Sequence, residues 1–346
     1  MLRESGKKVI AIAPTGIAAN NIDGQTIHSM FGLTPFGVLS FDTCKFLKSG
    51  KKEVIRKADV IIIDEVSMLR PDILDAINWT MKKNGLPGLK TKQVIFVGDL
   101  AQLPAVLDDN TRSVLYETYD GDQFFYSKIH KDLNVKEIEL SEVLRQTNEE
   151  FISHLNIIRM GGKSEYFKQF VNNEPEGIIL APHNTTVQFY NEKGLAAQKG
   201  ETFTFNAIIT GTAKPEEFQF EKTVRVKNGC KIMYLVNSQD NPLRNGTLGI
   251  FVSHNDCHYI RVGGVDYALS PINITKKVYV YSPITDKLEL KEVGSIEQIP
   301  IKLAYALSIH KSQGLTFDSV TIDLTLPCFQ KGQMYVALSR VRTPEG

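Results

Sequence analysis

The chain lacks several features that would assign it to particular classes of protein. No apolar stretch approaches the length of a membrane span, and the N-terminus does not have the layout of a signal peptide. Its four cysteines are scattered without metal-type spacing and suit a reducing compartment. Forty Lys and Arg against 39 Asp and Glu leave a net charge of +1, so the charge balance does not point to nucleic acid. We therefore expect a cytoplasmic protein without membrane contact, or a nuclear or mitochondrial one if the source is a eukaryote.

A phosphate-binding loop is also missing, which becomes informative beside the motifs described below. No Gly-x-x-x-x-Gly-Lys-Ser/Thr occurs in the 346 residues. Gly162-Lys163-Ser164 ends correctly, but Ile157 stands where the first glycine is required, and a helical pattern precedes it. Gly6-Lys7 is followed by Lys8, and Gly6 instead predicts the end of a short helical turn.

The first part of the chain has the pattern of an open α/β sheet. Val9–Ala13, Val60–Ile63 and Val94–Val97 are continuous apolar runs bounded by polar residues, as in parallel strands covered on both faces. Residues 72–83 have helical spacing. Ligands of such sheets bind beyond the carboxyl ends of the strands, and the polar motifs of this region directly follow strands.

The remainder predicts a second α/β unit that is interrupted by an antiparallel insert. A helix is expected at Phe151–Met160 and a buried strand at 178–180, and the α/β pattern resumes at 301–309 and 320–324. Short strands with Gly or Asn between them fill the interval and indicate a small barrel. We predict a first domain at 1–135, a second at 136–222 and 298–346, and the barrel at 223–297.

Asp64-Glu65 follows the second apolar strand and carries the clearest chemistry. An Asp at a strand end can hold Mg²⁺ on nucleotide phosphates, and the adjacent Glu can orient and deprotonate an attacking water. The alternative is that the pair only caps the next helix. The following Val66-Ser67-Met68 and the second motif favour the catalytic interpretation.

The second motif, Gly98-Asp99-Leu100-Ala101-Gln102-Leu103-Pro104, places Gln102 three residues after an Asp, where it can contact the γ-phosphate or the attacking water. The alternative is a turn with an exposed amide.

Arg145-Gln146 and Arg340 are candidates for a clamp on a transferring phosphoryl group. A surface salt bridge is the alternative for any single arginine, but the setting Tyr335-Val336-Ala337-Leu338-Ser339-Arg340 favours the clamp.

A third group of residues suits a sugar–phosphate chain held without sequence readout. It comprises Pro14-Thr15-Gly16, Thr26-Ile27-His28-Ser29-Met30-Phe31 and His310-Lys311-Ser312-Gln313-Gly314. His28 and Phe31 could stack on bases. The alternatives are a core aromatic for Phe31 and a structural histidine for His310.

Together these blocks resemble the PIF-type, RecD-related superfamily 1 DNA helicases, which move 5′→3′ on single strands. The resemblance runs from Ala13 to Arg340 in seven ordered blocks, and Asn245-Gly246-Thr247-Leu248-Gly249 resembles a turn of that family's inserted barrel. It implies two tandem RecA-like P-loop NTPase domains with parallel sheets and an SH3-like insert. It also implies ATP and Mg²⁺ as cofactors, single-stranded DNA as partner, a monomer, and a role in DNA replication, repair, recombination or telomere-type maintenance.

The resemblance also implies roles for individual residues. It gives Mg²⁺ to Asp64 and water activation to Glu65. It gives nucleotide contacts to Gln102, Arg145, Gln313, Gly314 and Arg340, with Arg340 as the arginine finger. The single-strand path would be lined by Pro14, Thr15, His28, Phe31, His310 and Lys311.

The chain departs from the family pattern at its start. Family members carry an adenine-contacting segment, a strand and the phosphate loop before the strand matched by 9–13, and none of these is among the 346 residues. We therefore expect a product truncated at its start, with an incomplete first domain and little or no ATP hydrolysis of its own. The alternatives are an ATP-independent pseudo-helicase or subunit that binds single-stranded DNA, and the motor subunit of a helicase–nuclease.

Overall fold

The structure, a computed structural model, describes residues 2–35, 37–171, 177–238, 240–255 and 257–346. Its first sheet is parallel throughout and has the order β2-β1-β3-β4. The strands are β1 (Val9–Ala13), β2 (Gln25–Thr26), β3 (Val60–Ile63) and β4 (Gln93–Phe96). This confirms the parallel α/β unit and the three predicted strands to within one residue.

Helices cover this sheet, and their ends follow from the local sequence. The longest of them, α4 (Pro71–Lys83), has Pro71 in its first turn, Asp72 beside it, and Lys82 and Lys83 in its last turn, as the helix dipole favours. It confirms the helix predicted at 72–83. The others are α1 (Gly16–Asn21), α2 (Ile27–Phe31), α3 (Ser49–Lys57), α5 (Asp109–Tyr119) and α6 (Lys128–Asp132).

The second parallel sheet is smaller, with the order β16-β5-β17. Its strands are β5 (Ile178–Ala181), β16 (Ala306–Ser308) and β17 (Val320–Ile322), and its helices are α7 (Glu149–Arg159), α8 (Asn184–Ala197) and α9 (Gln333–Leu338). The segment 136–140, where we expected the second unit to begin, forms no strand, and Ile138 and Leu140 are largely exposed. Phe151 on α7 lies in a buried apolar cluster of this unit.

The antiparallel region contains the predicted short strands but is larger than 223–297. One sheet has the order β12-β11-β10-β9-β15, a second β13-β14-β7, and a third β6-β8. Their strands are β6 (Phe203–Asn206), β7 (Ile208–Gly211), β8 (Thr223–Val226), β9 (Lys231–Tyr234), β10 (Leu248–His254), β11 (Cys257–Val262), β12 (Val265–Ala268), β13 (Ile272–Ser282), β14 (Lys287–Gln298) and β15 (Ile301–Leu303). The SH3-like closure and the exact domain boundaries remain predictions.

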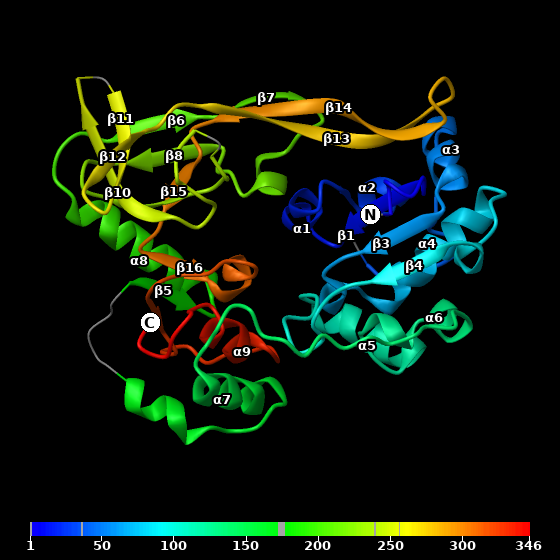
Figure 1. Cartoon of the computed structure of the whole chain (residues 1–346), viewed down its shortest axis with the longest axis horizontal. Coiled ribbons are helices and arrows are strands. Elements are labelled where there is room, and N and C mark those ends of the chain that lie inside the picture. Colours follow the sequence, from blue (N-terminus) through cyan, green and yellow to red (C-terminus); the bar gives the residue numbers. More distant parts are fainter. Residues whose placement is uncertain (1, 36, 172–176, 239, 256) are drawn as a thin grey trace.

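The long hairpin β13–β14 extends from this region across the first sheet (Figure 1). Its Tyr279 belongs to the core of the first unit, where the phenol oxygen accepts the Ala11 N–H at 3.2 Å. Near the hairpin turn, Asp286 pairs with Lys8 at 2.8 Å and with Lys57 at 3.6 Å. The first unit is therefore completed by residues far along the chain.

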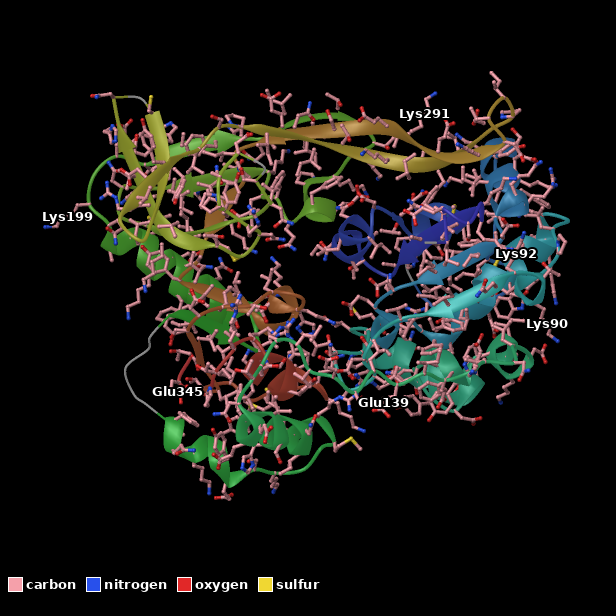
Figure 2. All side chains as sticks on the ribbon, in the orientation of Figure 1. Lys90, Lys92, Glu139, Lys199, Lys291 and Glu345 are labelled. Atoms are coloured by element: carbon pink, nitrogen blue, oxygen red, sulfur yellow. The ribbon has the colours of Figure 1, made fainter. Side chains whose placement is uncertain are left out.

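Short 3-10 turns carry several of the motifs. The turns used below are η1 (Val66–Met68), η5 (Pro215–Phe218) and η6 (Ile309–Ser312). Charged side chains such as Lys90, Lys199 and Lys291 lie at the outer margin of the molecule (Figure 2). Within the described part of the chain, no helix is long and apolar enough to cross a membrane.

Candidate functional site

Asp64 and Glu65 lie where β3 ends, held by backbone contacts to two neighbouring strands. The Asp64 N–H donates to the Ile12 carbonyl at 2.9 Å, and the Val66 N–H donates to the Val97 carbonyl at 3.1 Å. Glu65 has a φ of 52°. Gly98 has a φ of 156°, and a Cβ there would lie 2.9 Å from the Val66 nitrogen, so this position admits only glycine. The two strand-end motifs therefore pack directly against each other.

Gln313 joins these two motifs from the second unit. Its Nε2 donates to Glu65 Oε2 at 3.2 Å and to Gln102 Oε1 at 3.1 Å. Burial raises the pKa of Glu65, and the neighbouring Asp64 charge adds to the rise, while Arg340 and the Gln313 hydrogen bond oppose it. Three of the predicted catalytic residues therefore meet between the two parallel-sheet units.

Arg340 lies beside this cluster and is almost completely buried. It is 2% exposed, and its guanidinium donates to the carbonyls of Val336, Ser312 and Leu315. Burial, and next the charge of Arg145, lowers its pKa to about 10. These carbonyl acceptors are neutral and no carboxylate among the described residues forms an ion pair with Arg340, so its positive charge remains available to an anion.

Arg145 provides a second positive charge next to Arg340. Its Nη1 donates to the Ser339 carbonyl at 3.2 Å, and burial lowers its pKa. Gln146 donates to the carbonyls of Ser339 and Val341 and is buried, so it fixes the backbone around Arg340. A cavity of about 390 Å³ opens here, lined by Leu144, Arg145, Thr316 and Arg342. Arg145 and Arg342 thus line one cavity, and two arginines there suit a phosphate ligand.

The remaining predicted nucleotide residues have supporting positions. Gly314 directly follows Gln313 with a φ of 79°, so it forms the turn after the bridging glutamine. Asp64 Oδ1 accepts the Glu65 N–H at 2.9 Å, and its other oxygen has the chemistry of a Mg²⁺ ligand. Among the described residues no three His, Cys, Asp or Glu side chains form a metal-type group. A Mg²⁺ ion at Asp64 would thus need phosphate and water oxygens as further ligands, as nucleotide-bound Mg²⁺ does.

The predicted DNA-path residues of the first unit divide into two kinds. Thr15, next to Pro14, caps α1 by accepting the Ala18 N–H, and it lies at the carboxyl end of β1. His28 is half-buried, and its pKa is lowered by burial and then by the Arg70 charge. Phe31 is fully buried in the first core. Its ring therefore offers no surface to a base, and the core-aromatic alternative holds for Phe31.

His310 and Lys311 lie on η6 of the second unit. His310 Nε2 is 2.9 Å from Gln330 Oε1, and its ring stacks on Phe329. Lys311 is exposed. His310 thus has structural partners, as the alternative for this residue stated, while Lys311 is free to meet a phosphate.

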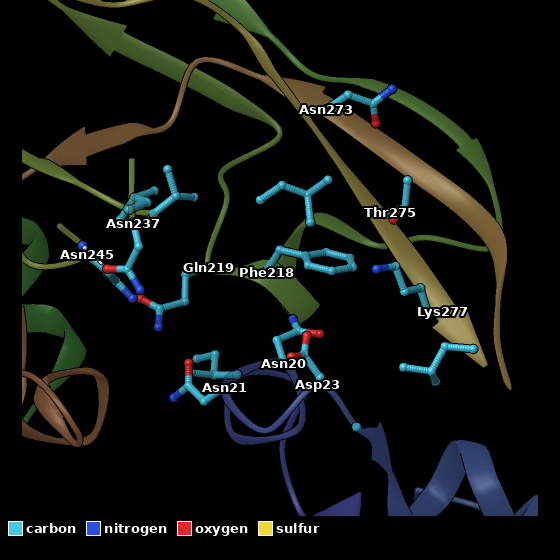
Figure 3. Close-up of a pocket in the computed structure, with 16 residues that line it drawn as sticks. Asn20, Asn21, Asp23, Phe218, Gln219, Asn237, Asn245, Asn273, Thr275 and Lys277 are labelled. Atoms are coloured by element: carbon cyan, nitrogen blue, oxygen red, sulfur yellow. Dashed lines mark hydrogen bonds between the residues drawn. The ribbon is translucent and has the colours of Figure 1, made fainter. Parts of the chain in front are cut away.

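A polar cavity of about 390 Å³ lies beside the Pro14-Thr15 end of β1. Figure 3 shows Asn20, Asn21 and Asp23 on one side, Phe218 and Gln219 of the η5 region above them, and Lys277 on β13. A Cβ added at Gly16 would lie 2.7 Å from the Glu217 carbonyl oxygen, so α1 packs directly on η5. This cavity was not predicted, because its walls come from four distant segments.

Sequence reasoning also missed the residues that hold the second motif. Arg159 pairs with Asp99 at 3.0 Å, and Gln330 donates to the carbonyls of Pro104 and Ala105. Asp99 stood inside a recognised motif. Arg159 and Gln330 stand outside every block of the pattern, and one sequence alone carries no signal for them.

Comparisons with known proteins point to one family. A family model described as PIF1-like helicase matches residues 1–169. The ATP-dependent DNA helicase Pif1 of Campylobacter jejuni is 29% identical over 383 residues, covering 99% of this chain and 82% of that protein. The ATP-dependent DNA helicase PIF1 of Emericella nidulans is 28% identical, and the chain spans 54% of it.

Solved structures match as well. Bacteroides sp Pif1 in complex with ADP-AlF4 is 33% identical, with a TM-score of 0.87 over 100% of this chain and 83% of that one. Bacteroides Pif1 bound to ssDNA is 34% identical over the same shares, with a TM-score of 0.68. The parallel sheets are therefore RecA-like. The predicted monomer finds no support, since one related structure is described as two coordinating Pif1 helicases at forked dsDNA.

Proposed function

Because the chain belongs to the PIF1-like helicase family, we propose that it is built to move 5′→3′ along single-stranded DNA, with ATP hydrolysis coupled to strand separation. Its role would be in replication, repair, recombination or telomere-type maintenance, inside the cell. The bridge from Gln313 to Glu65 and Gln102 carries this proposal, because it joins the two RecA-like units at one reacting point. A site shared between two units makes their closure depend on what is bound there.

The arrangement supports a division of labour in phosphoryl transfer. Glu65, with its raised pKa, would accept the proton of an attacking water that Gln102 and Gln313 orient. The paired Arg145 and Arg340 would stabilise charge that develops on the transferred phosphoryl group. A nucleotide-bound Mg²⁺, when held at Asp64, would supply charge neutralisation on the phosphate oxygens.

The DNA path is proposed to run past the carboxyl end of β1 and across η6. Thr15 and Lys311 offer a hydroxyl and a positive charge to backbone phosphates, which gives binding without sequence preference. The lowered pKa of His28 keeps its ring neutral at pH 7, so it would contribute a hydrogen bond or stacking rather than charge. Bacteroides Pif1 has been solved bound to ssDNA, which supports single-stranded DNA as the ligand. The chain would act on single-stranded DNA as a monomer, whereas two Pif1 helicases coordinate at forked dsDNA in a related structure.

We further propose that the 346-residue chain hydrolyses little ATP by itself. No Gly-x-x-x-x-Gly-Lys-Ser/Thr is among its residues, so the backbone cradle, the phosphate-binding Lys and the Mg²⁺-binding hydroxyl have no counterpart in it. The second candidate function is ATP-independent binding of single-stranded DNA, which the absence of the same motif favours.

The test measures ATP turnover and DNA binding of the purified chain together. We expect a fluorescent dT20 oligonucleotide to bind in an anisotropy titration, and ATP hydrolysis to stay at the level of a Glu65→Gln control. DNA-stimulated turnover above that control would refute the proposed inactivity and support a complete motor. Failure to bind dT20 at low salt would refute the helicase and binder proposals together.

A further inference from the structure

Residues 98–105, which we call the sensor loop, carry Gln102. The second unit contacts this loop at three points, and we call these three contacts together the grip. At its start, Arg159 of α7 donates from Nη2 to Asp99 Oδ1 at 3.0 Å and from Nε to Asp99 Oδ2 at 3.5 Å. In its middle, the loop packs so closely on Gly332 that a Cβ added there would lie 2.7 Å from the Ala101 carbonyl oxygen. At its end, Gln330 Nε2 donates to the Pro104 and Ala105 carbonyls at 3.2 and 3.1 Å.

Asp99 transmits the first contact into the loop itself. Its Oδ1 also accepts the Ala101 N–H at 3.1 Å, and its carbonyl accepts the Gln102 N–H at 3.0 Å. The same carboxylate therefore binds Arg159 and closes the turn that presents Gln102. Since Gln102 in turn accepts from Gln313, the contact of Arg159 is connected to Glu65 through Asp99, Gln102 and Gln313.

Gln330 adds a connection to the DNA side. Its Nε2 faces two carbonyl oxygens, so this atom must be the amide nitrogen, and the Oε1 atom must be the one that faces His310 Nε2 at 2.9 Å. His310 must consequently carry its proton on Nε2. A single amide thus joins His310, which lies on η6 next to Lys311 of the proposed DNA path, to the end of the sensor loop.

We infer that Arg159 and Gln330 are positioning residues that hold the sensor loop against the second unit, and that Gln330 couples the His310 region to the loop that presents Gln102. The coupling to DNA rests on the proposed function. The positioning of the sensor loop rests on the contacts alone. Neither residue touches the reacting atoms. Each acts through Asp99 or through the backbone of the loop.

The test measures hydrogen–deuterium exchange of the sensor-loop amides, which needs no ATP turnover. We expect Arg159→Ala and Gln330→Ala to speed exchange at Ala101 and Gln102 roughly three- to tenfold, because a partly exposed ion pair and two hydrogen bonds hold the loop closed. Arg261→Ala is the matched control for the ion pair, since Arg261 pairs with Asp266 on the remote sheet. Gln169→Ala, which removes an exposed bond to Tyr166, is the control for the amide. Exchange no faster than in these controls would overturn the grip.

Two further measurements separate positioning from general loosening. Arg159→Lys keeps a positive charge beside Asp99 and leaves the Asp99 bond to the Ala101 N–H intact, so it should retain part of the protection lost in Arg159→Ala. Saturating dT20 should change exchange at 98–105 in the wild type and should leave it unchanged in Gln330→Ala, although that variant still binds the oligonucleotide. An equal response in both would overturn the coupling. If the wild type binds no dT20, the proposed function and its coupling fail, while the grip is still decided by the exchange rates without DNA.

Discussion

Lys302 is a buried amine whose removal should stabilise the protein. It lies on β15 opposite Met233 of β9, is 5% exposed, and has no ion pair or hydrogen-bond acceptor among the described residues. Burial, and next the positive charge of Lys311, lowers its pKa from 10.5 to about 8, against a weaker opposite effect of Glu221. Folding therefore disfavours the charged form of this side chain.

The sign and size of the effect follow from the difference between the folded and unfolded pKa values. Below pH 8 both states carry the proton and the folded state bears the full cost of the buried charge. Between pH 8 and 10.5 the unfolded state retains a proton that the folded state has lost, so stability rises with pH, by about 1.4 kcal/mol per unit at most. The 2.5-unit difference between 10.5 and 8 corresponds to about 3 kcal/mol, as an upper bound.

Lys302→Met keeps the length of the side chain and removes its charge. We expect its free energy of unfolding at pH 7 to exceed that of the wild type by about 1–3 kcal/mol, and the gain to vanish as the pH approaches 10.5. The assay is urea unfolding followed by far-ultraviolet circular dichroism at pH 7, 8, 9 and 10. Lys231→Met on the neighbouring strand is the control, because Lys231 is exposed. A variant that is no more stable than this control at pH 7, or that keeps the wild-type rise above pH 8, would refute the reasoning.

Three other substitutions test separate features. Tyr279→Phe leaves the buried Ala11 N–H without its acceptor, so urea unfolding followed by Trp79 fluorescence should show a loss of about 1–2 kcal/mol in the first unit. Lys311→Ala should weaken binding to dT20 and reduce the slope of log affinity against log salt by about 0.7, as measured by anisotropy at several salt concentrations. Arg340→Lys cannot reach all of the carbonyl acceptors of the guanidinium, and calorimetry should show a destabilisation of about 2–3 kcal/mol.

The parallel strands and the reacting cluster could be predicted because each depends on local sequence. Apolar runs such as Val60–Ile63 have little alternative to a buried parallel strand, and the polar residues after them must meet at one edge of the sheet. Glu65 and Gln102 therefore meet as expected, and Gln313 joins them.

The parts that were missed depend on contacts between distant segments. Phe31 stands in a motif expected to touch DNA, yet its helix turns it into the core. The segment around Ile138 and Leu140 alternates like a strand but has no partner strand among the described residues. The Gln330 side chain donates a hydrogen bond to the Pro104 carbonyl, which lies 226 positions earlier in the sequence. No local sequence pattern marks such a contact.

The β13–β14 hairpin has a consequence for the order in which the protein is made. The first unit buries Tyr279 in its core, where the phenol oxygen accepts the N–H of Ala11 across 268 positions. A ribosome that has completed residues 1–135 has therefore not yet produced the side chain that closes this core. We expect the first core to be completed only after the hairpin emerges, which places this step late in folding.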